Sequence, residues 1–382
     1  MTDTSFERVW QAAEARLAAG RIPGYVAAVR IGGRVEVRAG GRTALGADSP
    51  PMREDTLFRI ASITKPMGAA LALSLVQDGV LDLGDPIARW LPEAASPRVL
   101  VAPDAPLHAT TEVQRPITVR HLLTATCGWG CVLEETPLQR AMFERGVFPG
   151  PLTPPMSGDD FVARVADLPL AFQPGEGWLY DTGMNLLGVL LSRAAGRPLS
   201  ELVAQRITGP LGMADTGFWT AAADRIATAY TPGDDGLEVL DPPDGLWSRP
   251  PTFEELSGGL LSTARDVLAF YCAMADGGAP VLSADSVALM TTDALTDEQR
   301  RHALPFVDAG GSWGLGTGVD VEAAQPWMAP GRWGWTGGTG TTAYVDPTRD
   351  TVSVLLTQRA MTGPLDGFGD FWSAVAQAAA QS

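Results

Sequence analysis

Residues 58–77 read FRIASITKPMGAALALSLVQ. The run after Pro66 is apolar at nearly every position, which predicts a helix that is buried on all sides. Pro66 fits only the first turn of such a helix, where its missing N–H removes no hydrogen bond. This places Ser62 at the N-terminus of the helix. Lys65 follows three residues later on the same face, with its amine in reach of the serine hydroxyl.

The chain holds 28 lysine and arginine residues, and Lys65 is the only lysine among them. A guanidinium stays protonated under ordinary conditions, whereas an ammonium in a desolvated site can lose its proton. We therefore hypothesise that Lys65 is at times neutral and acts as the base that a serine nucleophile needs. The alternative is that Lys65 has no special role and remains by chance in a chain that prefers arginine. A single S-x-x-K match also arises at random.

Strand-forming segments lie at both ends of the chain. Residues 25–31 and 35–38 flank a Gly32-Gly33 turn, and residues 341–346 and 351–357 form a second pair. The middle of the chain is mostly helical in pattern. We therefore expect an α+β fold, in which both chain ends build one antiparallel sheet around an inserted helical lobe. Helices are expected at 6–17, 62–77, 118–124, 158–166, 184–195, 264–274 and 368–381, and loops at 148–158 and 232–251.

Composition excludes several classes of function. A formal net charge of −16 disfavours nucleic acid and anionic membrane surfaces as partners. Cys127, Cys131 and Cys272 cannot all pair within one chain, and they form no metal-ligand pattern with the three histidines. We expect free thiols, no metal and no cofactor. The first residues lack the basic and apolar regions of a secretion signal, so a cytoplasmic location is expected.

Five segments, in this order along the chain, resemble motifs of the class C β-lactamase and penicillin-binding-protein superfamily, and most closely those of the family VIII carboxylesterases. The S-x-x-K segment is the first, and G-x-S-x-G, the signature of ordinary esterases, is absent. The other four segments are ITVRHLLT (117–124), QPGEGWLY (173–180) with LLG (186–188), SGGL (257–260) with STARD (262–266), and WTGGTG (335–340).

The resemblance implies a β-lactamase/transpeptidase-like fold and a set of roles. Ser62 becomes the acylated nucleophile, and Lys65 and Tyr180 share general acid and base duty. The backbone N–H groups of Ser62 and Gly338 form the oxyanion hole. Trp335, Thr336, Gly337 and Thr182 are the expected substrate-binding residues. Residues 1–75 and 290–382 are expected to form the sheet domain and residues 76–289 the helical domain, with the active site at their interface.

Two departures from the family pattern bear on the substrate. Thr182 stands where penicillin-recognising members carry the asparagine of Tyr-x-Asn, and Trp335 replaces the lysine that meets a β-lactam carboxylate. A site without that cation suits a neutral, partly apolar ester better than an anionic drug.

We therefore expect a serine carboxylesterase acting on a small-molecule ester or amide. The alternatives are a β-lactamase or D,D-peptidase with another cation such as Arg332, an acyltransferase of the same fold, and a binding protein that retains only the fold.

Overall fold

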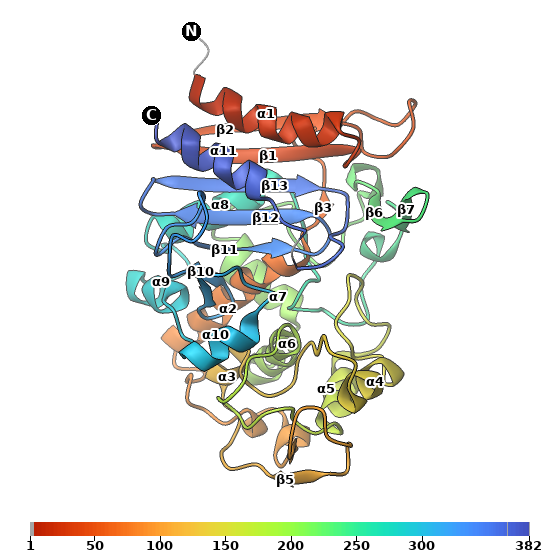
Figure 1. The fold of residues 1–382 in the computed structure, drawn as a ribbon, viewed down its shortest axis with the longest axis vertical. Coiled ribbons are helices and arrows are strands. Elements are labelled where there is room, and N and C mark those ends of the chain that lie inside the picture. The colour runs from red at the N-terminus through yellow and green to blue at the C-terminus, as the bar shows by residue number, and fades with distance from the viewer. Residues whose placement is uncertain (1–3, 365, 382) are drawn as a thin grey trace.

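The computed structural model describes residues 4–364 and 366–381. Its centre is a seven-stranded antiparallel sheet in the order β2-β1-β13-β12-β11-β10-β9, which confirms the expected α+β class. The N-terminal hairpin pairs directly with the last strand of the chain, and the two ends of the chain lie near each other (Figure 1). The strands are β1 (Gly24–Ile31), β2 (Arg34–Gly41), β9 (Gly311–Trp313), β10 (Gly318–Asp320), β11 (Trp333–Gly337), β12 (Thr341–Asp346) and β13 (Thr351–Thr357).

Helices cover both faces of the sheet. Helices α1 (Thr4–Ala18) and α11 (Gly369–Ala379) pack together over one face, and α8 (Ala264–Ala275) packs on β1, β12 and β13. Tyr25 and Val29 of β1 point towards α1 and α11, while Val26 and Ala28 join the core on the other face. The central strands are therefore buried on both sides, and every residue of β12 and β13 is buried.

The helical lobe surrounds α2 (Thr64–Gln77), which is buried along most of its length as its sequence predicts. Helix α2 packs against α6 (Thr182–Ala195), α7 (Leu199–Val203) and α9 (Ala284–Thr291). One cluster of buried apolar side chains runs from the sheet into this lobe, so the two parts share a core. The remaining helices are α3 (Val119–Leu123), α4 (Pro137–Glu144), α5 (Gly158–Ala166) and α10 (Asp297–Ala303).

Two sequence-based expectations need correction. Helix α8 lies within 76–289, the range expected for the helical domain, yet it packs on the sheet. The range 232–251, expected to be a loop, contains most of the hairpin formed by β6 (Ala229–Gly233) and β7 (Gly236–Asp241). Most of β7 is exposed or half-buried, so it lacks the apolar alternation by which a strand is recognised.

Two further strand pairs lie outside the main sheet, and the first of them joins distant parts of the chain. Strand β3 (Phe58–Arg59) pairs with β8 (Leu261–Ser262), and β4 (Arg98–Leu100) pairs with β5 (Thr110–Glu112). The first pair ties the segment before Ser62 to the segment that follows Ser257.

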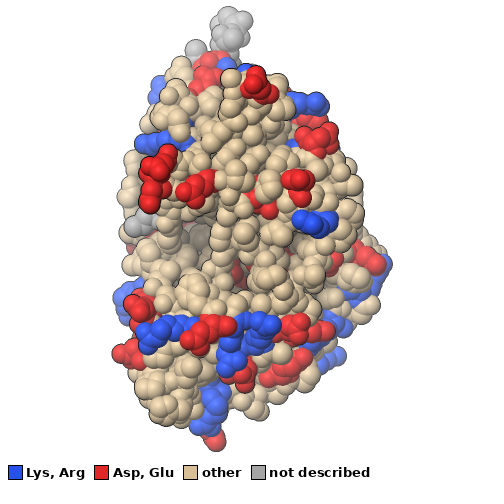
Figure 2. Space-filling model, turned by 90° about the vertical axis from the view of Figure 1, so that its right-hand side faces the viewer, with Lys and Arg blue, Asp and Glu red and all other residues tan. Residues whose placement is uncertain are grey.

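The surface carries charges of both signs. On the face shown in Figure 2, a belt of mixed acidic and basic side chains lies below a hollow that is surrounded mainly by uncharged atoms. Among the described residues, no helix is both long and apolar enough to cross a membrane.

Candidate active site

Ser62 lies in a short 3₁₀ turn, Ala61–Ile63, that leads directly into α2 at Thr64. The sequence predicted that Ser62 begins the helix, but it lies in the turn that precedes α2. Ala61 has a φ of 45°, a left-handed conformation that costs a residue with a side chain some energy. The backbone N–H of Ile60 donates to the Leu260 carbonyl at 3.0 Å, which fixes the approach to this turn.

Lys65 is fully buried on α2 and makes three close contacts. Its Nζ lies 2.9 Å from Ser62 Oγ, 2.6 Å from Asp181 Oδ1 and 2.7 Å from the carbonyl oxygen of Ser257. Three contacts use all three donors of an ammonium group.

The surroundings of Lys65 shift its pKa in the direction opposite to the one that burial alone would give. Burial by itself lowers the pKa of Lys65, but the Asp181 carboxylate and Tyr180 outweigh it, so that pKa lies above its ordinary value. Lys65 is therefore an ammonium in the resting site, paired with Asp181. The sequence-based hypothesis did not include this counter-ion.

Tyr180 lies beside both residues. Its Oη accepts a hydrogen bond from Trp335 Nε1 at 2.5 Å, and its ring centroid lies 4.3 Å from Lys65 Nζ. Burial raises the pKa of Tyr180 above its ordinary value, although Lys65 opposes the shift. The side chain is therefore a neutral phenol at rest. Phe306 and Trp313 pack against its ring and hold its orientation.

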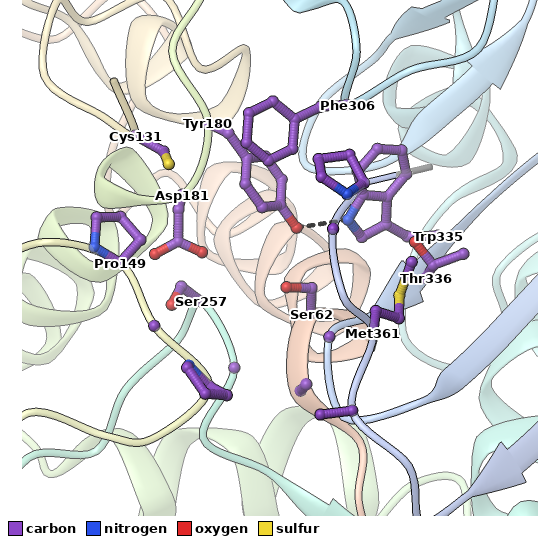
Figure 3. A pocket seen from close by; sticks show the side chains of 18 of the residues that line it. Ser62, Cys131, Pro149, Tyr180, Asp181, Ser257, Phe306, Trp335, Thr336 and Met361 are labelled. Atoms are coloured by element: carbon purple, nitrogen blue, oxygen red, sulfur yellow. Dashed lines mark hydrogen bonds between the residues drawn. The ribbon is translucent and has the colours of Figure 1, made fainter. Parts of the chain in front are cut away.

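A cavity of about 280 Å³ opens in front of Ser62. Figure 3 shows Ser62 and Tyr180 facing into it, with Trp335 and Thr336 on one side and Asp181 on the other. Gly338 also lines the cavity. Among the described residues that line it there is no lysine, arginine or histidine; its ionisable carboxyl groups belong to Asp181 and Glu255.

Two of the residues expected to bind substrate lie elsewhere. Thr182 is fully buried at the start of α6, and its Oγ1 has no hydrogen-bond partner among the described residues. Gly337 packs against the Ser62 segment instead of lining the cavity. A Cβ at this position would overlap the backbone oxygen of Ile60 and the hydroxyl of Thr341. Gly337 thus allows β11 to approach the nucleophile's turn.

Gly337→Ala is expected to lower the free energy of unfolding by about 1–3 kcal/mol, because the new methyl group overpacks this contact. The shift of Ile60 should also displace Ser62 and lower kcat. Urea unfolding of Gly338→Ala provides the matched control, since a Cβ at Gly338 meets nothing within 4 Å. Its stability should stay within about 0.5 kcal/mol of the native value. Equal stability losses in the two variants would contradict this account.

The sequence did not identify Asp181, although it stands between Tyr180 and Thr182. Its side chain lines the cavity and is 11% exposed. Its backbone has φ 83° and ψ −68°, a strained conformation for any residue with a side chain. The signal that could have identified Asp181 was its position: it is an acidic residue next to the candidate tyrosine, in a chain with one lysine.

A buried network holds the carbonyl that contacts Lys65. The Ser257 hydroxyl donates to Glu255 Oε1 at 2.6 Å, and the Ser257 N–H donates to Asn185 Oδ1 at 2.9 Å. Asn185 also donates to Glu255 Oε1 at 3.2 Å. Burial, followed by the nearby Asp181 charge, raises the pKa of Glu255. Glu255 is thus displaced towards its neutral form.

Arg332 is not available as a replacement for the missing lysine of a β-lactamase. It is 5% exposed, and its Nη1 donates to Asp320 Oδ2 at 3.0 Å. It stacks over Tyr344, 3.7 Å from the ring centroid, and lines a neighbouring cavity. Arg332 does not line the cavity that contains Ser62.

The histidine and cysteine side chains that the sequence offered for chemistry are part of the packed structure instead. His121 accepts a hydrogen bond from the Thr118 N–H at 3.1 Å and caps α3. Cys127 and Cys131 are buried free thiols, and Cys272 is a half-buried one, as expected. No metal-ligand cluster occurs within residues 4–364 and 366–381.

Known proteins are similar to this chain in both sequence and fold. A β-lactamase family model matches residues 9–377. Protein Rv1367c of Mycobacterium tuberculosis is 40% identical over 325 residues, which cover 81% of this chain and 79% of that protein. Esterase EstB of Burkholderia gladioli is 34% identical over 373 residues, which cover 90% of this chain and 89% of EstB.

The solved structure of EstCE1, a hydrolase with promiscuous acyltransferase activity, matches with a TM-score of 0.85 at 26% identity. The match covers 98% of this chain and 99% of EstCE1. The family model and the esterase relative confirm the family resemblance that the sequence motifs implied. The chain belongs to the β-lactamase family, among the β-lactamase-like serine hydrolases close to the family VIII carboxylesterases.

Proposed function

We propose that the protein is a carboxylesterase that works through an acyl-enzyme on Ser62. The observation that carries this proposal is the cavity itself: a serine and its lysine lie 2.9 Å apart at a pocket whose described lining includes no basic side chain. Apolar groups such as Phe306, Trp335 and Met361 form much of the wall. A neutral ester with an apolar acyl or alcohol group fits this lining.

In the proposed reaction, Ser62 Oγ attacks the ester carbonyl carbon. Lys65 and Tyr180 take the serine proton and return a proton to the leaving alcohol. The backbone N–H groups of Ser62 and Gly338 stabilise the oxyanion. Water then attacks the acyl-enzyme, and the same groups transfer protons in the reverse direction.

The cavity's charge argues against an anionic β-lactam as the main substrate. Asp181 and Glu255 are its ionisable carboxyl groups, and the described lining residues offer a penicillin carboxylate no lysine, arginine or histidine side chain. The test is a panel of p-nitrophenyl esters of rising chain length, assayed beside a chromogenic cephalosporin. Ester turnover well above cephalosporin turnover is expected. Cephalosporin hydrolysis that matches or exceeds ester hydrolysis would promote the β-lactamase alternative.

Trp335→Lys is expected to shift the ratio of kcat/KM towards β-lactams by about tenfold. A lysine offers the drug's carboxylate a charge-assisted hydrogen bond of about 1.5–3 kcal/mol, and about half of that energy gives a tenfold change. The ratio is measured with one ester and one cephalosporin. Trp335→Phe is the control, because it removes the indole N–H without adding charge. The prediction fails if both variants change the ratio equally.

Acyl transfer is the second candidate function. It is favoured by the likeness to EstCE1, whose solved structure is described as that of a hydrolase with promiscuous acyltransferase activity. An acyl-enzyme in an apolar cavity partitions between water and any alcohol that enters. Adding a primary alcohol to an ester assay and quantifying the new ester against the free acid tests this function. Acid alone at all alcohol concentrations would rule it out.

A further inference from the structure

Asp181 is bound to Lys65 more closely than any other group in the site. The Nζ–Oδ1 distance is 2.6 Å, and a strained backbone with φ 83° holds the carboxylate in place. The other two Lys65 contacts are uncharged oxygens, those of Ser62 and the Ser257 carbonyl. An ammonium with three occupied donors has no lone pair, so it cannot accept the Ser62 proton directly.

The other titratable groups around Lys65 are a phenol, a thiol and a carboxyl group that does not contact its amine. Burial raises the pKa of Tyr180, which is a neutral phenol that accepts from Trp335. Burial also raises the pKa of the Cys131 thiol to about 12, and Glu255 accepts hydrogen bonds from Ser257 and Asn185 instead of Lys65. Asp181 is therefore the carboxyl group in direct contact with the Lys65 amine.

We propose that Asp181 is a positioning residue that receives, through Lys65, the proton that leaves Ser62. This inference rests on the proposed acyl-enzyme function. It names the final proton acceptor, which the Ser62, Lys65 and Tyr180 assignment leaves open.

The proton transfers balance. In acylation, one Nζ–H bond breaks as Asp181 Oδ1–H forms, and the Ser62 O–H bond breaks as a new Nζ–H forms. Ser62 Oγ bonds to the carbonyl carbon, and the resulting oxyanion carries the negative charge that Asp181 gave up. Lys65 begins and ends as an ammonium.

When the tetrahedral adduct collapses, its C–O bond to the leaving group breaks. The leaving alkoxide takes the Tyr180 proton, Lys65 reprotonates Tyr180, and Asp181 returns its proton to Lys65. The site is restored to a neutral tyrosine, an ammonium and a carboxylate.

The proposal is tested by measuring how kcat/KM for a p-nitrophenyl ester depends on pH, in the native protein and in Asp181→Asn. The direction in which the acid limb of this profile shifts decides the outcome. If Asp181 is the acceptor, the substitution removes the group that takes the proton from Lys65. The variant then needs Lys65 to lose a proton to solvent, so its acid limb moves up by about one pH unit or more. Activity at pH 7 should fall by roughly 10- to 100-fold.

The two rival explanations give different results. If Lys65 is a simple base whose pKa Asp181 raises, removing the carboxylate moves the acid limb to lower pH. If Asp181 only supports the local structure, activity falls by the same factor at every pH. Either result would overturn the proposal. Glu255→Gln is the matched control, because it removes the cavity's other carboxyl group and should leave the acid limb in place. An equal upward shift in Glu255→Gln would also overturn it.

The single lysine permits a second measurement that needs no substrate. With lysine labelled by ¹³C at Cε, the one side-chain signal comes from Lys65, and its chemical shift reports the charge. Native Lys65 should remain charged throughout the pH range of full activity. Asp181→Asn should lower its midpoint until it coincides with the variant's acid limb.

The NMR measurement also separates the two proposals. If the native protein cleaves no ester, the proposed function fails, and the titration still decides the charge of Lys65. A Lys65 that is already neutral at pH 7 in the native protein would overturn the role of Asp181, whether or not esters are cleaved.

Discussion

Replacing Ser62 by alanine is expected to reduce ester turnover by about 10⁶-fold, the size of the loss seen when a serine protease loses its nucleophile. Among the described residues, Ser62 has the one serine hydroxyl that is hydrogen-bonded to the lysine amine. The loss should appear in kcat, because the cavity that binds substrate is unchanged. Steady-state kinetics with a short-chain p-nitrophenyl ester measure it.

Covalent labelling identifies the nucleophile independently. An acylating inhibitor should add its mass to the peptide that contains Ser62, and Ser62→Ala should lose the label. Ser257 provides the control, because it also lines the cavity but donates its hydroxyl to Glu255. Ser257→Ala should still be labelled at Ser62. A label on Ser257 or on Ser312 in the native protein would show that the motif assignment is wrong.

The parts of the site that local sequence encodes were predictable. Ser62 and Lys65 are three residues apart, and the apolar run to Gln77 fixes their helix as buried. The strands 341–346 and 351–357 were predicted with the bounds that the structure shows, because their turn and β-prone residues are adjacent. The ordered motifs then placed Tyr180 and Trp335 at the same site, although they lie 155 positions apart.

The charge state of the site was not predictable in this way. It depends on Asp181 meeting Lys65 across 116 positions, and on a carbonyl that Glu255 and Asn185 hold in place. A lone lysine in an apolar helix suggests a lowered pKa, since burial is the part of the environment that a sequence reveals. The counter-ion, which reverses the direction, becomes visible only when the chain is folded.

The sequence also could not show where Thr182 and Gly337 lie relative to the cavity. Both occupy motif positions that implied contact with substrate, yet one is buried in α6 and the other packs against Ile60. A motif records which residues recur together, and it does not separate those that touch substrate from those that let two elements approach. Their neighbours Asp181 and Gly338 line the cavity instead.

Lys65→Arg is expected to lower kcat/KM for esters by about 10³-fold, within the range of general acid–base effects. The change keeps the positive charge beside Asp181 but cannot pass a proton, because a guanidinium does not deprotonate in proteins. Kinetics are compared with thermal unfolding, since the larger side chain enters a fully buried position.

Lys65→Ala provides the second variant if arginine disturbs the fold. It leaves a space that a small amine can enter, and added ethylamine should restore part of the activity in proportion to its concentration. Guanidine at the same concentration should not, because it stays protonated and cannot relay the serine proton. A folded Lys65→Arg variant that retains a tenth or more of the native activity would remove proton transfer by Lys65 from the mechanism. It would leave this lysine with only the role of a fixed cation between Ser62 and Asp181.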